Sequence, residues 1–286
     1  MIDLPPHALD HVLTAMKGQV DAIDAHEAGA RTGRDPEDVH QMRVAVRRLR
    51  AILRASRPLF DPRWVDGLRR ELKWLGTVLG GVRDLDVLHA YLRSQLEALP
   101  APGRGAGRPY LLRHLDADRV RARAALRVAL ASPRYARLLA RLQAALVHPP
   151  TRPSSVPLPG IAASEFEKLR KAVAKLPRPP SAEELHAVRI KVKRARYAAE
   201  LVQPIIGRRA GRFIAKAKKL QDILGEHQDA VVAEEYLRKV TERTPAGQAR
   251  AQPLIQQQRK RRKKALAAFS EKWPKLKRRG RKAYGD

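Results

Sequence analysis

The sequence predicts an all-α protein, and three observations favour that fold class. Hydrophobic residues make up 44% of the 286 residues but aromatic residues only 5%, and this Ala-, Leu- and Val-rich composition favours helices over a β-sandwich or barrel. No stretch alternates between apolar and polar residues as a half-buried strand does. Apolar residues instead recur at helical spacing. The first such set comprises Leu9, Val12, Leu13, Met16, Val20 and Ile23.

Start and stop signals in the first half of the chain predict the helices that follow this opening helix. Asp35-Pro36 supplies an N-cap and a Pro at the first helical position, and predicts a helix that ends near Pro58. Asp61-Pro62 repeats the start signal. We expect Gly80-Gly81 to end that helix, because Gly is a poor helix former.

Similar signals continue through the second half. Ser132-Pro133 predicts another helix start. The capping box Ser181-x-x-Glu184 opens a helix that we expect to run to about Gln203, because Pro204 follows it.

Two irregular segments divide the helices. Residues 100–109, rich in Pro and Gly, predict a loop within the first half, and the Pro-rich residues 148–160 predict a boundary between two units. We therefore expect a first helical bundle at residues 1–147, a linker at 148–160, a second bundle at 161–273 and a basic tail at 274–286.

The charge of the chain indicates a polyanionic partner. Lys and Arg total 59 against 29 Asp and Glu, which gives a net charge of +30. The candidate partners are nucleic acid, inorganic polyphosphate, other phosphate-rich polymers and anionic lipid. The chain has no Cys, which excludes disulfides, thiolate metal sites and cysteine nucleophiles. We see no signal-peptide pattern and no apolar stretch of transmembrane length, and therefore expect a cytoplasmic protein of undetermined oligomeric state.

An internal repeat links the two halves. Residues 39–50 match residues 185–196, with His40 opposite His186 and Arg43 opposite Arg189. Residues 75–92 match residues 220–237 in the same order and at nearly the same offset. Two matched blocks favour a duplicated helical unit over a chance similarity between Arg-rich helices.

The first block of each repeat places its cations on one helix face. At about 100° per residue, the cations between His40 and Arg54 fall within one quadrant, with Arg48 at its flank. Met42, Val46, Leu49 and Leu53 lie on the opposite, apolar side. Like charges at this spacing repel each other and destabilise the helix. An anion that bridges them removes this free-energy cost. Arg offers a planar fork of donors that matches phosphate oxygens.

Three motifs identify a family. They are His40-x-x-Arg43-x-x-x-Arg47-Arg48-x-Arg50, Leu79-Gly80-x-x-Arg83-Asp84-x-Asp86-Val87 and His186-x-x-Arg189-x-x-x-Lys193-Arg194-x-Arg196. Over roughly residues 5–273 the chain strongly resembles the CHAD domain, a histidine-containing α-helical domain. The resemblance implies two related helical bundles about a pseudo-two-fold axis, and inorganic polyphosphate bound to a basic central surface, at polyphosphate granules. Gln228 and Val231 depart from the pattern where Arg and Asp are expected, so they inherit no role.

The matched cations and histidines are the predicted site. The candidate polyphosphate-binding residues are His40, Arg43, Arg47, Arg48, Arg50, Arg54, His186, Arg189, Lys193, Arg194 and Arg196. A His beside polyphosphate gains proton affinity, so we expect binding to strengthen in mild acid.

Other interpretations of these residues stay open. The cationic face could be a solvated helix surface, and the two histidines could pack or cap a helix. We expect Asp84, Asp86 and Asp229 to cap a helix or to pair with Arg. His227 lacks a second ligand at suitable spacing, so we expect no metal and no cofactor.

The sequence suggests binding rather than catalysis. It contains no Walker loop, and no Glu-x-Glu-x-Lys tract of the triphosphatase type that often accompanies this family, so we expect no enzymatic activity. The alternative function is a nucleic-acid-binding protein that contacts the phosphate backbone, which the basic runs at 259–264 and 275–282 would suit. Against it, the repeat helices carry no set of residues that reads base edges.

Overall fold

Helices account for almost the whole chain in the computed structural model, which describes residues 7–97, 107–153, 157–242 and 245–285. Within these ranges no residue lies in a strand, and the predicted all-α fold is confirmed. The first half contains α1 (His7–Thr32), α2 (Pro36–Ala55), the short 3-10 helix η1 (Arg57–Leu59), α3 (Pro62–Glu97), α4 (Gly107–Leu130) and α5 (Pro133–Val147). The second half contains α6 (Leu158–Ala174), α7 (Ala182–Ile206), α8 (Arg208–Thr241) and α9 (Pro245–Tyr284).

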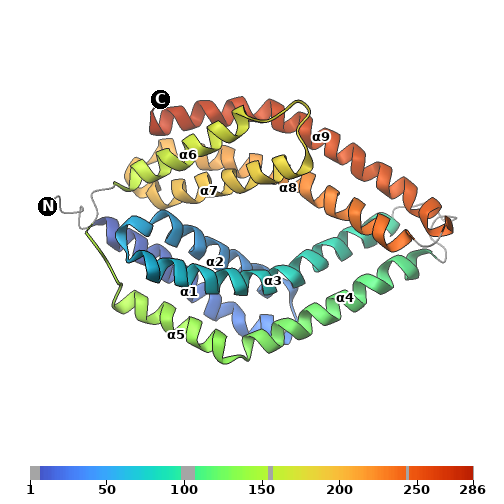
Figure 1. The fold of residues 1–286 in the computed structure, drawn as a ribbon, viewed down its shortest axis with the longest axis horizontal. Coiled ribbons are helices and arrows are strands. Elements are labelled where there is room, and N and C mark those ends of the chain that lie inside the picture. The colour runs from blue at the N-terminus through green and yellow to red at the C-terminus, as the bar shows by residue number, and fades with distance from the viewer. Residues whose placement is uncertain (1–6, 98–106, 154–156, 243–244, 286) are drawn as a thin grey trace.

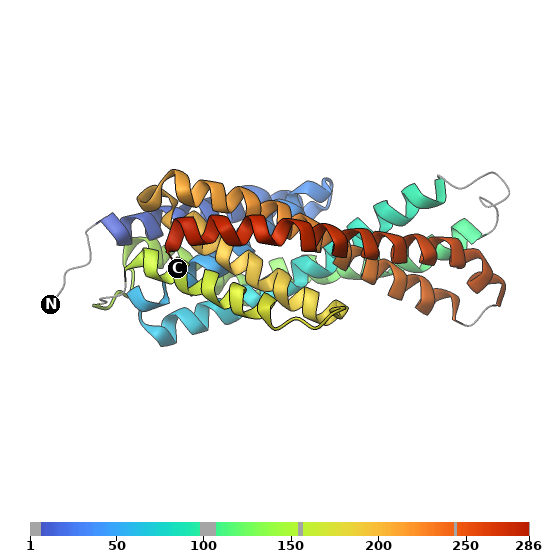
Figure 2. The same ribbon diagram turned by 90° about the horizontal axis from the view of Figure 1, so that it is seen from above.

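The helices form two layers that touch at both ends of an elongated molecule. Helices α1 to α5 form the lower layer in Figure 1, and α6 to α9 form the upper one. The layers contact through α2 and α7 at one end, and through α3, α4 and α8 at the other. Seen from above, the long helices α3, α4, α8 and α9 extend the molecule in one direction (Figure 2). We call their distal parts, residues 85–97, 112–124, 231–242 and 251–262, the arms.

The predicted helix starts are confirmed by their capping contacts. The Asp35 carboxylate accepts a hydrogen bond from the backbone N–H of Glu37 at 2.7 Å, and Pro36 begins α2. Ser132 caps α5 through the N–H of Tyr135. Ser181 and Glu184 form the reciprocal capping box of α7. Each cap satisfies donors that the first helical turn leaves free, which is why such short motifs predict helix starts well.

Two predicted helix ends are wrong. Helix α3 continues through Gly80-Gly81 to Glu97, because its apolar face stays buried beyond the glycines and this packing outweighs a penalty of about 1 kcal/mol per Gly. Helix α7 likewise includes Pro204 and ends only where Gly207 adopts a φ of 69°. Most of the predicted loop at 100–109 lies outside the described residues, and α4 begins at Gly107.

Three hydrophobic clusters form the core, and two of them join the layers. The first lies among α1, α2, α3 and α5, and includes Leu201 and Val202 of α7, so it crosses between the layers. The second lies among α6, α7, α8 and α9, and the third joins all four arms. The apolar residues predicted behind the α2 cations are all buried. The division into two bundles and the internal duplication stay predictions from the sequence.

The segment predicted as a basic tail is helical as far as Tyr284, where α9 packs against α6 and α8. Tyr284 lies between Phe166 and Phe213, with ring centroids 6.0 and 5.5 Å away. Gly280 lies so close to the Phe166 ring that a Cβ at this position would overlap it. The absence of a side chain at Gly280 therefore allows the end of α9 to dock.

We expect Gly280→Ala to lower the free energy of unfolding by about 1–3 kcal/mol, because the buried Phe166 ring cannot move aside without disturbing Phe213 and Tyr284. Gly81→Ala is the matched control, since a Cβ there meets no atom within 4 Å and Ala is the better helix former by about 1 kcal/mol. Urea unfolding followed by circular dichroism measures both. Equal effects of the two substitutions would contradict this docking role.

Candidate functional site

The two helices of the matched repeat blocks, α2 and α7, contact each other and bring their cationic faces together. Between them lies a pocket with a volume of about 320 Å³, which we call the α2–α7 cleft. One carboxylate, Glu165 of α6, lies among its lining residues, and Ala, Ile and Tyr side chains complete the walls. The cations that line the cleft are Arg47, Arg50 and Arg54 of α2, Arg69 of α3, and Lys193 and Arg194 of α7.

Several polar atoms in and beside the cleft are buried without a hydrogen-bond partner among the described residues. A buried donor without an acceptor costs about 1–3 kcal/mol, so such atoms are rare unless a ligand serves them. Most of these atoms belong to groups that can only donate in their charged forms. The set comprises His40 Nδ1, the Nε atoms of Arg47, Arg50, Arg69 and Arg189, Tyr197 Oη and, as an acceptor, Glu165 Oε2.

The electrostatics of the cleft are dominated by burial and by repulsion between its cations. Burial and the neighbouring cations Arg189, Arg47 and Arg43 lower the pKa of Lys193 to about 7. Burial likewise lowers the pKa of Arg50 and of Arg194, again helped by adjacent arginines. These arginines keep their charge at neutral pH because their ordinary pKa is so high. The cleft therefore holds like charges at a free-energy cost that an anion would remove.

Carboxylates flank the row of cations at its two ends. Arg43 pairs with Asp84 at 3.1 Å, and Asp229, the repeat match of Asp84, acts electrostatically on Arg189. The expected pairing of Asp84 with Arg is confirmed. At the other end, Glu165 lies 3.5 Å from Arg54. Between Arg43 and Arg54 the row runs about 16 Å along α2.

The two matched histidines lie at the Arg43 end in different surroundings. Burial, then the charge of Arg83 and those of the α2 arginines, lowers the pKa of His40 despite the opposing effect of Glu37. His186 Nδ1 lies 2.9 Å from Gln228 Oε1, which can only accept, so Nδ1 carries the proton. Gln228, a departure from the first repeat, thus orients the second histidine. Neither ring lines the cleft itself.

Arg43 and Arg189, like the two histidines, are not among the residues that line the cleft. Two further predicted site residues point elsewhere. Arg196 is buried, pairs with Glu200, donates to Gln221 and stacks over the Tyr197 ring. Arg48 is exposed and lines a separate pocket of about 260 Å³. Neither residue lines the cleft.

Conversely, the sequence prediction did not include Arg69 and Glu165, which do line the cleft. Arg69 falls outside the two repeat-matched blocks, and Glu165 belongs to a helix that the motifs do not cover. Only the packing of α3 and α6 against the repeat helices brings them to the site.

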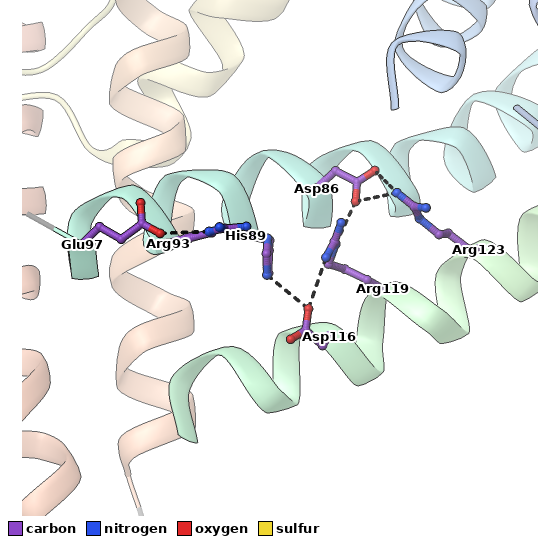
Figure 3. Close-up of polar contacts among 7 residues, drawn as sticks. All are labelled: Asp86, His89, Arg93, Glu97, Asp116, Arg119 and Arg123. Atoms are coloured by element: carbon purple, nitrogen blue, oxygen red, sulfur yellow. Dashed lines mark hydrogen bonds and ion pairs between the residues drawn. The ribbon is translucent and has the colours of Figure 1, made fainter. Parts of the chain in front are cut away.

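In the arms, by contrast, carboxylates neutralise the arginines (Figure 3). Asp86, buried on α3, accepts hydrogen bonds from Arg119 and Arg123 of α4, which confirms its expected pairing with Arg. Asp116 contacts both Arg119 and His89. No group of three or more His, Asp or Glu residues suited to a metal ion occurs in the described part of the chain. None of its helices is long and apolar enough to cross a membrane.

Comparisons with known proteins agree with this architecture. The family model of the CHAD domain matches residues 14–238. An uncharacterized protein of Mycobacterium tuberculosis, found in two strains, is 34% identical over 248 residues. That match covers 82% of this chain and 46% of the relative, so the chain spans about half the length of the curated relatives it matches.

Two solved structures share the fold. The CHAD domain from the plant Ricinus communis superposes with a TM-score of 0.67 at 29% identity, covering 96% of this chain and 91% of that one. PptA from Streptomyces chartreusis superposes with a TM-score of 0.78 at 22% identity, covering 93% and 98% of the two chains.

The buried charge of Lys193 predicts a pH-dependent stability. Above a pH of about 7 the folded state loses this proton, while the unfolded chain keeps it up to a pKa of about 10.5, so the unfolded state binds more protons in that window. The penalty of the buried charge is thus fully present below pH 7 and declines as the pH rises. We expect Lys193→Met to stabilise the protein at pH 6, and this gain to shrink toward pH 10. Urea unfolding of both proteins across this range measures it, and a gain that does not change with pH would contradict the burial of a charged Lys193.

Proposed function

The chain belongs to the CHAD domain family, and from this premise we propose that it binds inorganic polyphosphate, without catalysis, in the α2–α7 cleft. One observation supports the proposal above all others. Six cations from three helices line one pocket, and several of their donors are buried without partners. A ligand that supplies many acceptor oxygens in a row satisfies those donors and removes the repulsion between the cations.

The shape of the site favours a single linear chain of phosphates. A DNA or RNA duplex carries its phosphates on a convex surface, which does not enter a pocket of about 320 Å³. A linear chain without bases or sugars has no bulky groups to place, and its charges repeat along the same direction as the row of cations. Duplex nucleic acid therefore contacts only exposed cations outside the cleft, such as Lys263 and Lys264 of α9. Such contacts are sequence-independent and steeply salt-dependent.

The acidic groups around the cleft support a non-catalytic role. Glu165 accepts a hydrogen bond from Lys168 at 2.9 Å and pairs with Arg54, and Asp84 pairs with Arg43. Cations thus engage Asp84 and one oxygen of Glu165. We propose that polyphosphate binding places this protein at polyphosphate granules.

Substitutions in the cleft and on the exposed surface should affect the affinities for polyphosphate and for duplex DNA differently. We expect long-chain polyphosphate to bind at least about tenfold more tightly than duplex DNA of equal phosphate content at the same ionic strength, because only the former reaches the cleft. Arg47→Gln with Arg50→Gln should weaken polyphosphate binding by at least about tenfold, at about 1–3 kcal/mol per lost charge-assisted contact, and leave duplex binding nearly unchanged. Competition titrations measure both affinities.

The matched control removes two charges from the exposed face of α9. We expect Lys263→Gln with Lys264→Gln to weaken duplex binding more than polyphosphate binding. Circular dichroism checks that each variant stays helical. If the α9 variant has the larger effect on polyphosphate, or if the two polyanions bind equally with equal salt dependence, the cleft is not the site and the protein is a general polycation.

A further inference from the structure

Glu165 is an unusual residue for an anion site. It is the one carboxylate among the residues that line the α2–α7 cleft, and its side chain is only 9% exposed. Oε1 accepts the hydrogen bond from Lys168 and faces Arg54, whereas Oε2 is buried without a partner. The last side-chain torsion of Glu is broad, so a small rotation offers this oxygen to the cleft.

Glu165 keeps its negative charge at neutral pH. Burial raises the pKa of its carboxyl, but the hydrogen bond from Lys168 and the charges of Arg54, Lys168 and Arg194 outweigh burial, so the pKa lies below its ordinary value. An ionised carboxylate can only accept hydrogen bonds. It therefore repels every fully ionised phosphate and attracts only a phosphate that brings a proton of its own.

The two kinds of phosphate in a polyphosphate chain differ in this respect. An internal phosphate has one acidic group, which is fully ionised at neutral pH. A terminal phosphate has a second, weaker acidic group, comparable to a phosphate monoester with a second pKa of about 6, so it carries a P–OH part of the time. Only the end of the chain can donate a hydrogen bond to a carboxylate.

We propose that the Glu165 end of the cleft binds the terminal phosphate of the chain, whose P–OH donates to Glu165 Oε2 while the neighbouring arginines hold its other oxygens. This inference rests on the proposed function and adds that the site distinguishes a chain end from an internal segment. Internal phosphates would then lie along the row toward Arg47, where the cleft lining is cationic.

Glu165 lies where the cleft meets a second pocket. This second pocket of about 320 Å³ adjoins the cleft, and four residues line both pockets. Two of these are the paired Arg54 and Glu165, and the other two are Ala55 and Ile161. A linear chain that follows the cations of α2 meets the carboxylate of Glu165 at this junction, beside Arg54.

Linear tripolyphosphate and cyclic tetrametaphosphate test the proposal, because they carry similar charge at pH 7 but only the linear molecule has ends. Calorimetric titration at fixed ionic strength compares the two for the unaltered protein and for Glu165→Gln. In this variant we expect the amide oxygen to keep the contact with Lys168, which turns the NH₂ group, a donor, toward the cleft. Glu165→Met, which lacks any acceptor, is the second variant, and circular dichroism checks both folds. Glu167→Gln is the matched control, because Glu167 lies on the same helix but pairs with Arg170 and does not line the cleft.

We expect the unaltered protein and Glu167→Gln to prefer the linear molecule by about tenfold, the value of one charge-assisted hydrogen bond. Both Glu165 variants should lose this preference, with weaker linear binding and unchanged or tighter cyclic binding. If Glu165 only repels anions, its substitution increases the affinity for both ligands equally, and the proposal is overturned. Equal binding of both ligands by the unaltered protein overturns it as well. If long-chain polyphosphate itself fails to bind, the proposed function fails instead.

Discussion

Repulsion between cations in the seam of α2 and α7 is the constraint on which the rest of the structure depends. Folding buries Lys193 beside Arg189 of its own helix and Arg47 of the opposite layer, and burial together with these charges lowers the pKa of Lys193 to about 7. Such an arrangement opposes folding, so other interactions must hold the layers together. The hydrophobic cluster that includes Leu201 and Val202 crosses between the layers beside the seam, and the arm cluster joins them at the far end. The apolar packing therefore keeps the cations in place before any ligand arrives.

The acidic residues are distributed unequally between the arms and the cleft. In the arms, Asp86 holds two arginines, and Glu234 accepts from Arg238, Arg259 and Arg262, so buried carboxylates there serve as structural centres. In the cleft, six cations share one carboxylate. With 29 acids against 59 bases, the chain cannot neutralise every cation. The positions that it leaves unneutralised and buried are those where a phosphate polymer has most to contribute.

The features that were predictable from the sequence are those that depend on neighbouring residues. The cap at Asp35 and the cationic faces of the repeat helices follow from short-range spacing, and the structure contains both. Gly80-Gly81 was misleading because burial of the following turns decides whether α3 continues. Arg69 and Glu165 reach the cleft through tertiary packing alone, and Arg196 is turned away by a partner one helical turn along. Short-range sequence spacing therefore predicts the cationic helix faces. Tertiary packing determines which side chains line the cleft.

The central claim is that the cleft is built to receive phosphates, and a crystal structure of the protein with polyphosphate long enough to span the row tests it most directly. The account predicts ordered phosphates between α2 and α7, within hydrogen-bond distance of the guanidinium groups of Arg47 and Arg50, whose Nε atoms are buried without partners in the free chain. Phosphates ordered only on the exposed faces of α8 or α9, with the cleft unchanged, would contradict it.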